Sequence, residues 1–175
     1  MNKILDGKVL AADIQQKIKQ EIHKKGLRPG LAIVLVGDDE ASKLYVSKKK
    51  KASQEVGIDF HEYLLVANTT QEELLKTIDF LNKDESVDAI LVQLPLPEHF
   101  DTDKIITAID PKKDVDGFHK ENIKDFLADK ATITPGLPLG VLRLIEQTKE
   151  KLDNKQAVIV SKGKIFSQPM IKILE

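Results

Sequence analysis

The sequence lacks cysteine entirely, and neither sign of charge dominates it. Its 175 residues carry 27 lysines and arginines against 28 aspartates and glutamates, so the formal net charge is −1 at pH 7. The missing cysteines exclude a disulfide framework, thiolate metal ligands and a cysteine nucleophile. The balanced charge argues against a dedicated nucleic-acid or membrane-surface binder.

Long apolar runs are missing as well. No apolar stretch is long enough to span a bilayer, and the first residues contain no apolar core of a signal peptide. The four histidines do not have the spacing of metal ligands, and the carboxylates do not cluster with them. We therefore expect a cytoplasmic protein without a metal, and with neither a membrane nor a nucleic acid as partner.

Short apolar runs alternate with amphipathic segments over the first ninety or so residues. Runs rich in β-branched and apolar residues predict buried strands at 31–36, 60–66 and 89–93. The segments 9–25, 41–56 and 70–82 have helical periodicity, and Thr70 with Glu73 predicts a capping box. Strands that alternate with helices are typical of parallel βαβ units. The sequence thus predicts an α/β fold, an open parallel sheet with flanking helices.

The pattern changes after the third predicted strand. Two prolines follow Gln93 closely, so the chain must leave the sheet there. Further helices are predicted at 104–109, 121–127 and 139–149. A strand at 156–161 and a helix starting at Pro169 then predict the beginning of a second α/β domain, the rest of which we expect to be absent.

Tyr45 and Lys49 stand four positions apart on a predicted helix, so both project from one face and can reach the same ligand. A lysine that acts as an acid or base needs its pKa lowered toward neutrality, by desolvation or by nearby positive charge. The run of lysines at 48–51 also fits a solvated helix face with no catalytic role. These residues leave both interpretations open.

Two further segments hold polar side chains where parallel sheets bind ligands, beyond the carboxyl ends of the strands. Gln93 ends a buried strand, where its amide needs partners that either a ligand or the loop backbone can supply. Asp114 and Asp116 lie in a polar turn before Gly117. A carboxylate there matches a planar edge with two N–H donors, although aspartates also occupy ordinary turns.

Three segments together resemble the signatures of one family. They read SKLYVSKKKK at 42–51, VDAILVQLPLP at 87–97 and PKKDVDGFH at 111–119. In this order and spacing they resemble the bifunctional methylenetetrahydrofolate dehydrogenase/methenyltetrahydrofolate cyclohydrolase family, and residues 31–38 fit it too. The resemblance covers essentially the whole chain, and its QLPLP and KDVDGFH segments are highly specific.

The resemblance implies a tetrahydrofolate derivative as substrate and a role for each candidate residue. Lys49 would be the general acid/base of the cyclohydrolase step, and Gln93 would hydrogen-bond and tune it. Tyr45 would stack along the aminobenzoyl ring, and Asp116 would grip the amino and ring N–H edge of the pterin. The implied substrate-binding residues are Tyr45, Lys49, Val92, Gln93, Leu94 and Asp116. Because the methenyl substrate is an amidinium-like cation, a neutral lysine beside it is favoured over a charged one.

The resemblance also implies a domain organisation. Residues 1–138 would form the substrate domain, 139–150 a connecting helix, and 151–175 the start of a Rossmann-type domain for NADP or NAD. Cofactor contacts would fall on Ser161, Lys162 and Gly163, where the family has a Gly-Arg-Ser turn. The bulkier residues limit how closely the backbone approaches a phosphate. Because the remaining strands that would complete a dinucleotide site are expected to be absent, we expect that this chain does not oxidise methylenetetrahydrofolate by itself.

Two classes of function stay open at this point. One is an enzyme of the family that keeps its folate pocket and cyclohydrolase chemistry. The other is a non-catalytic folate-binding or interaction module derived from the family. The resemblance adds the expectation of a homodimer.

Overall fold

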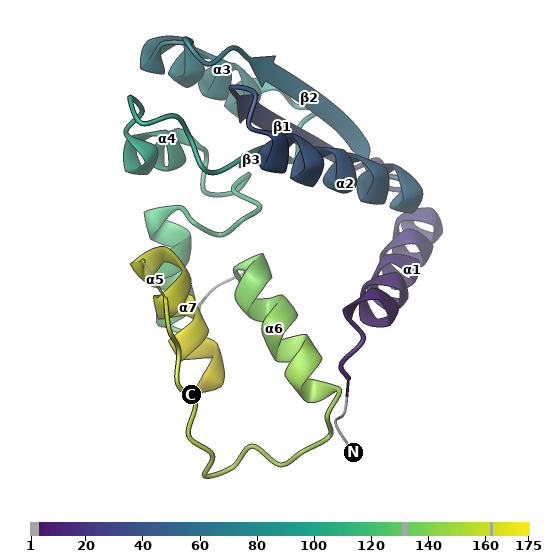
Figure 1. The fold of residues 1–175 in the computed structure, drawn as a ribbon. Coiled ribbons are helices and arrows are strands. Elements are labelled where there is room, and N and C mark those ends of the chain that lie inside the picture. The colour runs from purple at the N-terminus through teal and green to yellow at the C-terminus, as the bar shows by residue number, and fades with distance from the viewer. Residues whose placement is uncertain (1–3, 131–132, 162) are drawn as a thin grey trace. The chain divides into compact units, whose positions relative to one another are not determined.

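The computed structural model describes residues 4–130, 133–161 and 163–175. Its contacts divide the chain into two compact units, one formed by residues 14–115 and the other by residues 1–13 together with 116–175. The larger unit carries a sheet, and helices make up the regular structure described in the smaller one (Figure 1).

A parallel sheet forms the centre of the unit 14–115. Its strands are β1 (Gly30–Val36), β2 (Asp59–Leu65) and β3 (Ala89–Val92), in the order β2-β1-β3. Leu31 pairs with Phe60 of β2 on one side and with Ala89 of β3 on the other, both in parallel. The predicted open parallel sheet is confirmed, with each strand within one residue of its predicted bounds.

The helices of this unit follow the predicted alternation. They are the C-terminal part of α1 (Gly7–Lys25), α2 (Glu40–Val56), α3 (Gln71–Lys83) and α4 (Thr102–Ala108). The predicted capping box is present, because the Glu73 amide donates to Thr70 Oγ1 at 3.2 Å and the Thr70 amide donates to Glu73 Oε2 at 2.8 Å. Helix α2 ends at Gly57, whose φ of 92° is left-handed and suits glycine.

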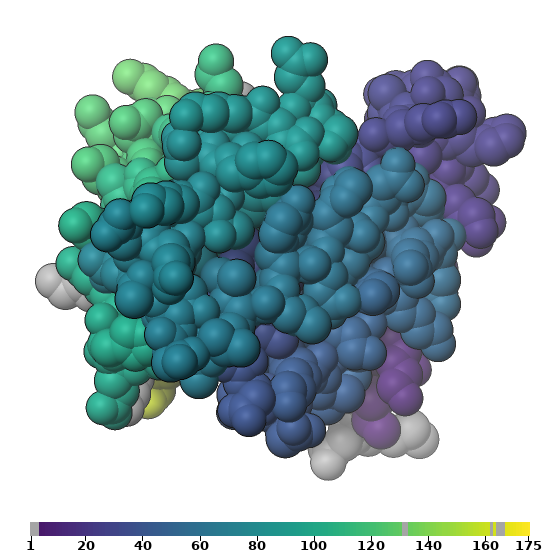
Figure 2. All heavy atoms as spheres, turned by 90° about the horizontal axis from the view of Figure 1, so that it is seen from above, coloured from purple at the N-terminus to yellow at the C-terminus, as the bar shows by residue number. Residues whose placement is uncertain are grey.

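The core lies on both faces of the sheet, as a strand apolar at every position requires. On one face, Val34 and Ile90 pack with Leu74 and Ile78 of α3 and with Ile105 of α4. On the other face, β1 and β3 pack against α2 through the following buried residues: Ile33, Leu35, Leu91 and Val46. Figure 2 shows the blue and teal atoms of this unit in close contact over most of the visible face.

The smaller unit contains helices α5 (Lys120–Leu127), α6 (Gly136–Glu146) and α7 (Lys164–Leu174). Helix α6 begins three residues before the predicted start. Pro138 fits in its first turn because the first amides of a helix have no partner within the helix. Helix α7 likewise begins before the predicted start at Pro169, which lies inside it.

The strand predicted at 156–161 is not formed. Val158 and Val160 are 88% and 93% exposed, and the segment has no regular secondary structure. A β-branched run becomes a strand only when a neighbouring strand supplies hydrogen-bond partners. In the described ranges, the sheet consists of β1, β2 and β3, and this segment does not join it.

Gly30 provides a test of the packing at the start of β1. A Cβ added there would collide with the carbonyl oxygen of Ser86, whereas one added at Gly140 of α6 meets open space. We predict that Gly30→Ala lowers the free energy of unfolding by about 2 kcal/mol. Gly140→Ala should leave it unchanged or raise it by up to about 1 kcal/mol. Urea unfolding followed by circular dichroism measures both, and equal stabilities would contradict this account of the β1 start.

Candidate active site

The candidate site lies at the carboxyl edge of the sheet. Because β1 and β3 are parallel, the chain leaves both strands at the same edge, and there Val36 leads toward α2 while Val92 leads into Gln93. Ligands of open parallel sheets bind outside this edge. The fold therefore brings the beginning of α2 and the QLPLP segment into one region.

A short turn fixes the start of α2. Gly37, with φ of 86°, donates its amide to the Leu65 carbonyl at 2.8 Å. Asp39 is the N-cap of α2, and its carboxylate accepts from the Ser42 amide at 2.8 Å. Hydrogen bonds from the backbone amide and the side chain of Ser42 lower the pKa of the Asp39 carboxyl group. The cap sets where α2 begins and so where its side chains project.

Lys49 and Gln93 form the central contact of the site. Lys49 Nζ donates to Gln93 Oε1 at 3.0 Å. The other end of the same amide is held because Gln93 Nε2 donates to the Leu94 carbonyl at 2.7 Å, and the Gln93 backbone amide donates to the Val34 carbonyl at 2.9 Å. Gln93 thus has a fixed orientation that turns its oxygen toward Lys49.

The neighbouring lysines make different contacts. Lys50 pairs with Glu62 at 2.9 Å, and Lys51 lies 3.9 Å from Glu55. Both pairs lie on exposed or half-exposed surface and fit the solvated helix face that a lysine run predicts. The half-buried Lys49 contacts a neutral amide at the sheet edge.

The other predicted substrate-binding residues of this unit differ in exposure. Tyr45 is 60% exposed, one helical turn before Lys49, so its ring is accessible to a ligand. Leu94 is half-buried beside Gln93. The side chain of Val92 packs in the core with α3, so its contribution to a ligand contact is limited to the backbone.

Asp116 directly follows a segment that is attached to β3. Ile90 forms a parallel bridge with Asp114, and the Ile90 amide donates to the Lys113 carbonyl at 2.7 Å. Asp114 is buried and Asp116 is half-buried. Asp116 is the first residue of the smaller unit in this part of the chain.

The predicted cofactor contacts do not form a dinucleotide site in the described residues. Ser161 Oγ donates to the Gly163 carbonyl at 3.0 Å, and the Gly163 amide points back to Ser161 Oγ at 3.3 Å. A Rossmann-type phosphate site needs a strand, a glycine-rich turn and a helix. Here α7 follows a segment without a strand. Lys162 lies outside the described residues.

Within the described part of the chain, no group of three or more histidine, aspartate or glutamate side chains is arranged to hold a metal ion. None of the helices described there combines the length and the apolar character needed to cross a bilayer.

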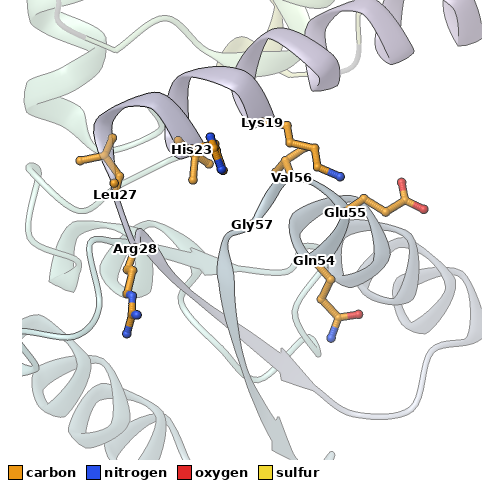
Figure 3. A pocket seen from close by; sticks show the side chains of 10 residues that line it. Lys19, His23, Leu27, Arg28, Gln54, Glu55, Val56 and Gly57 are labelled. Atoms are coloured by element: carbon orange, nitrogen blue, oxygen red, sulfur yellow. The ribbon is translucent and has the colours of Figure 1, made fainter.

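A pocket of about 460 Å³ opens where α1 and α2 end (Figure 3). Its walls include Lys19 and His23 of α1, Arg28 before β1, and Gln54 and Glu55 of α2. It lies beside the amino ends of β1 and β2, so it is separate from the edge where Lys49 and Gln93 meet. None of the predicted site residues lines it.

Sequence reasoning missed residues that support the site. The aspartate before α2, Asp39, has the typical signal of an N-cap and was detectable from sequence. Lys113 and Asn82 gave no such signal. Their side chains bind backbone groups distant in sequence, and a lysine or asparagine at a helix end or in a turn is usually a surface residue.

The chain is thus an α/β protein whose parallel sheet carries an accessible tyrosine, a lysine and an oriented amide at its carboxyl edge, the edge where such sheets bind ligands. Comparison with known families matches residues 5–116 to the family described as tetrahydrofolate dehydrogenase/cyclohydrolase, catalytic domain. That match covers more than half of the chain. The chain belongs to this family.

Relatives and solved structures agree with that assignment. The bifunctional protein FolD of Acetivibrio thermocellus is 45% identical over 175 residues, which cover 98% of this chain and 61% of the relative. FolD of Geotalea daltonii is 47% identical over 97% of this chain and 62% of the relative. The chain therefore spans about three fifths of the length of these relatives.

Two crystal structures have the same fold. The FolD methylenetetrahydrofolate dehydrogenase/cyclohydrolase of Campylobacter jejuni superposes with a TM-score of 0.92 at 43% identity, over 98% of this chain and 62% of that one. The Trypanosoma brucei enzyme, solved with NADP and an inhibitor, gives a TM-score of 0.93 at 31% identity, over 98% and 60% of the two chains.

The N-cap of α2 predicts a pH dependence of stability. Because the pKa of Asp39 lies below its ordinary value of 3.8 in the folded chain, its charged form stabilises the fold above that pH, and this stabilisation is lost as pH falls through the lowered pKa. We expect wild type to be more stable than Asp39→Asn at pH 7. This difference in stability should disappear as the pH falls below the lowered pKa of Asp39. Thermal unfolding between pH 7 and pH 2 measures it. A gap that does not change with pH would contradict the prediction, since other carboxylates titrate in both proteins.

Proposed function

We propose that this chain acts in the interconversion of one-carbon tetrahydrofolates and hydrolyses 5,10-methenyltetrahydrofolate to 10-formyltetrahydrofolate. The observation that carries the proposal is the hydrogen bond from Lys49 Nζ to Gln93 Oε1 at the carboxyl edge of the sheet. Membership of the tetrahydrofolate dehydrogenase/cyclohydrolase family supports the same reaction class. The relatives that share it are named as bifunctional proteins.

In the proposed reaction Lys49 acts as general base. The one-carbon bridge of the substrate is part of an amidinium-like cation and is therefore open to attack by water. Neutral Lys49 accepts a proton from that water as its oxygen bonds to the bridge carbon. The bond from this carbon to N5 then breaks, N5 takes up a proton, and the hydroxyl proton is lost as the formyl group forms on N10. The sum of these steps consumes one water and releases one proton.

Gln93 supports this role by its geometry. Its oxygen accepts from Lys49, while its own N–H group is held by the Leu94 carbonyl. The amide therefore orients the lysine without contributing a negative charge that would favour the protonated form. A cationic substrate beside Lys49 acts in the same direction, because like charges repel and the neutral amine is favoured.

Tyr45 and Asp116 bind the substrate in this proposal. The exposed ring of Tyr45 offers a face for stacking along the aminobenzoyl ring. The Asp116 carboxylate accepts two hydrogen bonds from the amino group and ring N–H of the pterin. The backbone of Val92 and the half-buried Leu94 flank Gln93, and in this proposal they border the same substrate.

The oxidation step of the family uses NADP or NAD, and the Trypanosoma brucei relative was solved with NADP. The described residues of 151–175 lack the strand-turn-helix arrangement of a dinucleotide site. We therefore assign the hydrolysis, and no oxidation, to the 175-residue chain on its own. A homodimer and a cytoplasmic location complete the proposal.

Lys49→Met tests the proposed base. Removing a general base lowers turnover by about 10²- to 10⁴-fold. The loss of absorbance of methenyltetrahydrofolate, corrected for the spontaneous reaction, measures the rate. Lys48→Met is the matched control, because its side chain is an exposed neighbour in the same run, and it should retain wild-type turnover. Equal rates for Lys49→Met and wild type would remove Lys49 from the mechanism.

A second assay tests whether the chain on its own catalyses hydrolysis without oxidation. We expect the purified 175-residue chain to form no methenyltetrahydrofolate from methylenetetrahydrofolate with NADP or NAD, because a dinucleotide needs the strand-turn-helix site that its described residues do not form. Absorbance of the reduced cofactor measures this. Saturable reduction of either cofactor would contradict the assignment, and folate binding without hydrolysis would instead favour a non-catalytic binding module.

A further inference from the structure

The segment before Asp116 is fixed to helix α3 by two side chains. The first is Asn82, near the end of that helix. Its Nδ2 donates to the Ala108 carbonyl and its Oδ1 accepts from the Asp110 amide, both at 2.8 Å. The segment is thereby held where it leaves α4 and turns toward β3.

The second side chain is Lys113. Its Nζ donates to the carbonyl oxygens of Leu81 at 3.1 Å and Asp84 at 2.8 Å. These carbonyls lie at the end of α3, where they also accept the backbone amides of Asp84 and Val87 and where the negative end of the helix dipole favours a cation. The half-buried Lys113 thus binds the C-terminus of α3 from a distance of about thirty residues along the chain.

The backbone of the same residue binds the sheet. The Lys113 carbonyl accepts from the Ile90 amide at 2.7 Å, and the Val115 amide points to the Ile90 carbonyl at 3.4 Å. Lys113 therefore connects the end of α3 to β3, the strand that leads into Gln93. Loss of its ammonium group removes the attachment to α3 and leaves the backbone attachment to β3.

We propose that Lys113 is a positioning residue for substrate binding, which acts by fixing the place of Asp116. The inference rests on the proposed function, in which Asp116 binds the pterin. Asp116 comes directly after Val115, and consecutive Cα atoms are about 3.8 Å apart, so a shift of the segment 113–115 passes directly to Asp116. A misplacement of about 1 Å is enough to weaken a directed contact strongly.

Lys113→Met tests the proposal, because methionine keeps an unbranched apolar side chain and removes the ammonium group. We expect the KM for methenyltetrahydrofolate to rise about tenfold, with kcat within about twofold of wild type, as for loss of a contact made equally in ground and transition states. The pH profile of kcat should stay unchanged, because Lys49 is untouched. A wild-type KM overturns the proposal. If Lys113→Met does not fold, Lys113→Leu replaces it, because leucine also lacks a donor, and a wild-type KM for that variant overturns the proposal equally.

Two matched controls separate positioning from stability. Lys112→Met makes the same change at the exposed neighbouring residue, and Thr70→Ala weakens α3 at its opposite end by removing the capping box. Both should keep the wild-type KM. If Thr70→Ala raises KM as much as Lys113→Met does, the effect belongs to the stability of α3, and the proposal is wrong.

A double-mutant cycle tests the route through Asp116. In an Asp116→Ala background, Lys113→Met should change KM by less than twofold, because the residue it positions is gone. A full tenfold effect in that background overturns the proposal. Calorimetry of methenyltetrahydrofolate binding to wild type distinguishes failure of the proposed function from failure of this inference alone. Absence of binding and turnover in wild type overturns the proposed function, whereas wild-type binding that Lys113→Met leaves unchanged overturns only this inference.

Discussion

The site depends on the parallel pairing of β1 with β3. Parallel strands end at one edge, so the chain enters α2 and the Gln93 segment from adjacent positions. An antiparallel neighbour would place Gln93 at the opposite edge, about 15 to 20 Å from the start of α2 for strands of this length. The contact between Lys49 and Gln93 is therefore a consequence of strand direction, and strand direction follows from the helical crossovers that the sequence places between its apolar runs.

The polar groups at this edge are held mainly by backbone partners. Asp39 binds the first turn of α2 and Gln93 binds the Leu94 carbonyl at this edge, whereas Lys113 binds the last carbonyls of α3 near the amino ends of β1 and β3. The Asp39 contact satisfies an amide that has no partner within α2, and the other two contacts add a side-chain donor to a backbone carbonyl. Backbone groups at the ends of helices and strands thus help to orient the side chains of the site. The stability of these ends is therefore linked to the geometry of the site.

Much of the sheet unit was predictable because its signals are local. The run 31–36 is apolar at every position and bounded by glycines, and Thr70 with Glu73 specifies a helix start within four residues. The strand expected at 156–161 was wrong because pairing depends on a neighbouring strand, which no local pattern supplies. Pro169 was expected to start a helix, but it lies inside α7. The link of Lys113 to α3 was not predictable, since it joins residues about thirty positions apart.

The central claim is that Lys49 faces the bound substrate whereas its neighbours in the lysine run do not. Acetylation of lysines followed by mass spectrometry, with and without a saturating tetrahydrofolate analogue, measures this residue by residue. The account predicts that the analogue slows labelling of Lys49 and leaves Lys48 and Lys51 unchanged. Labelling of Lys49 at the same rate in both conditions, with binding of the analogue established separately, would contradict it.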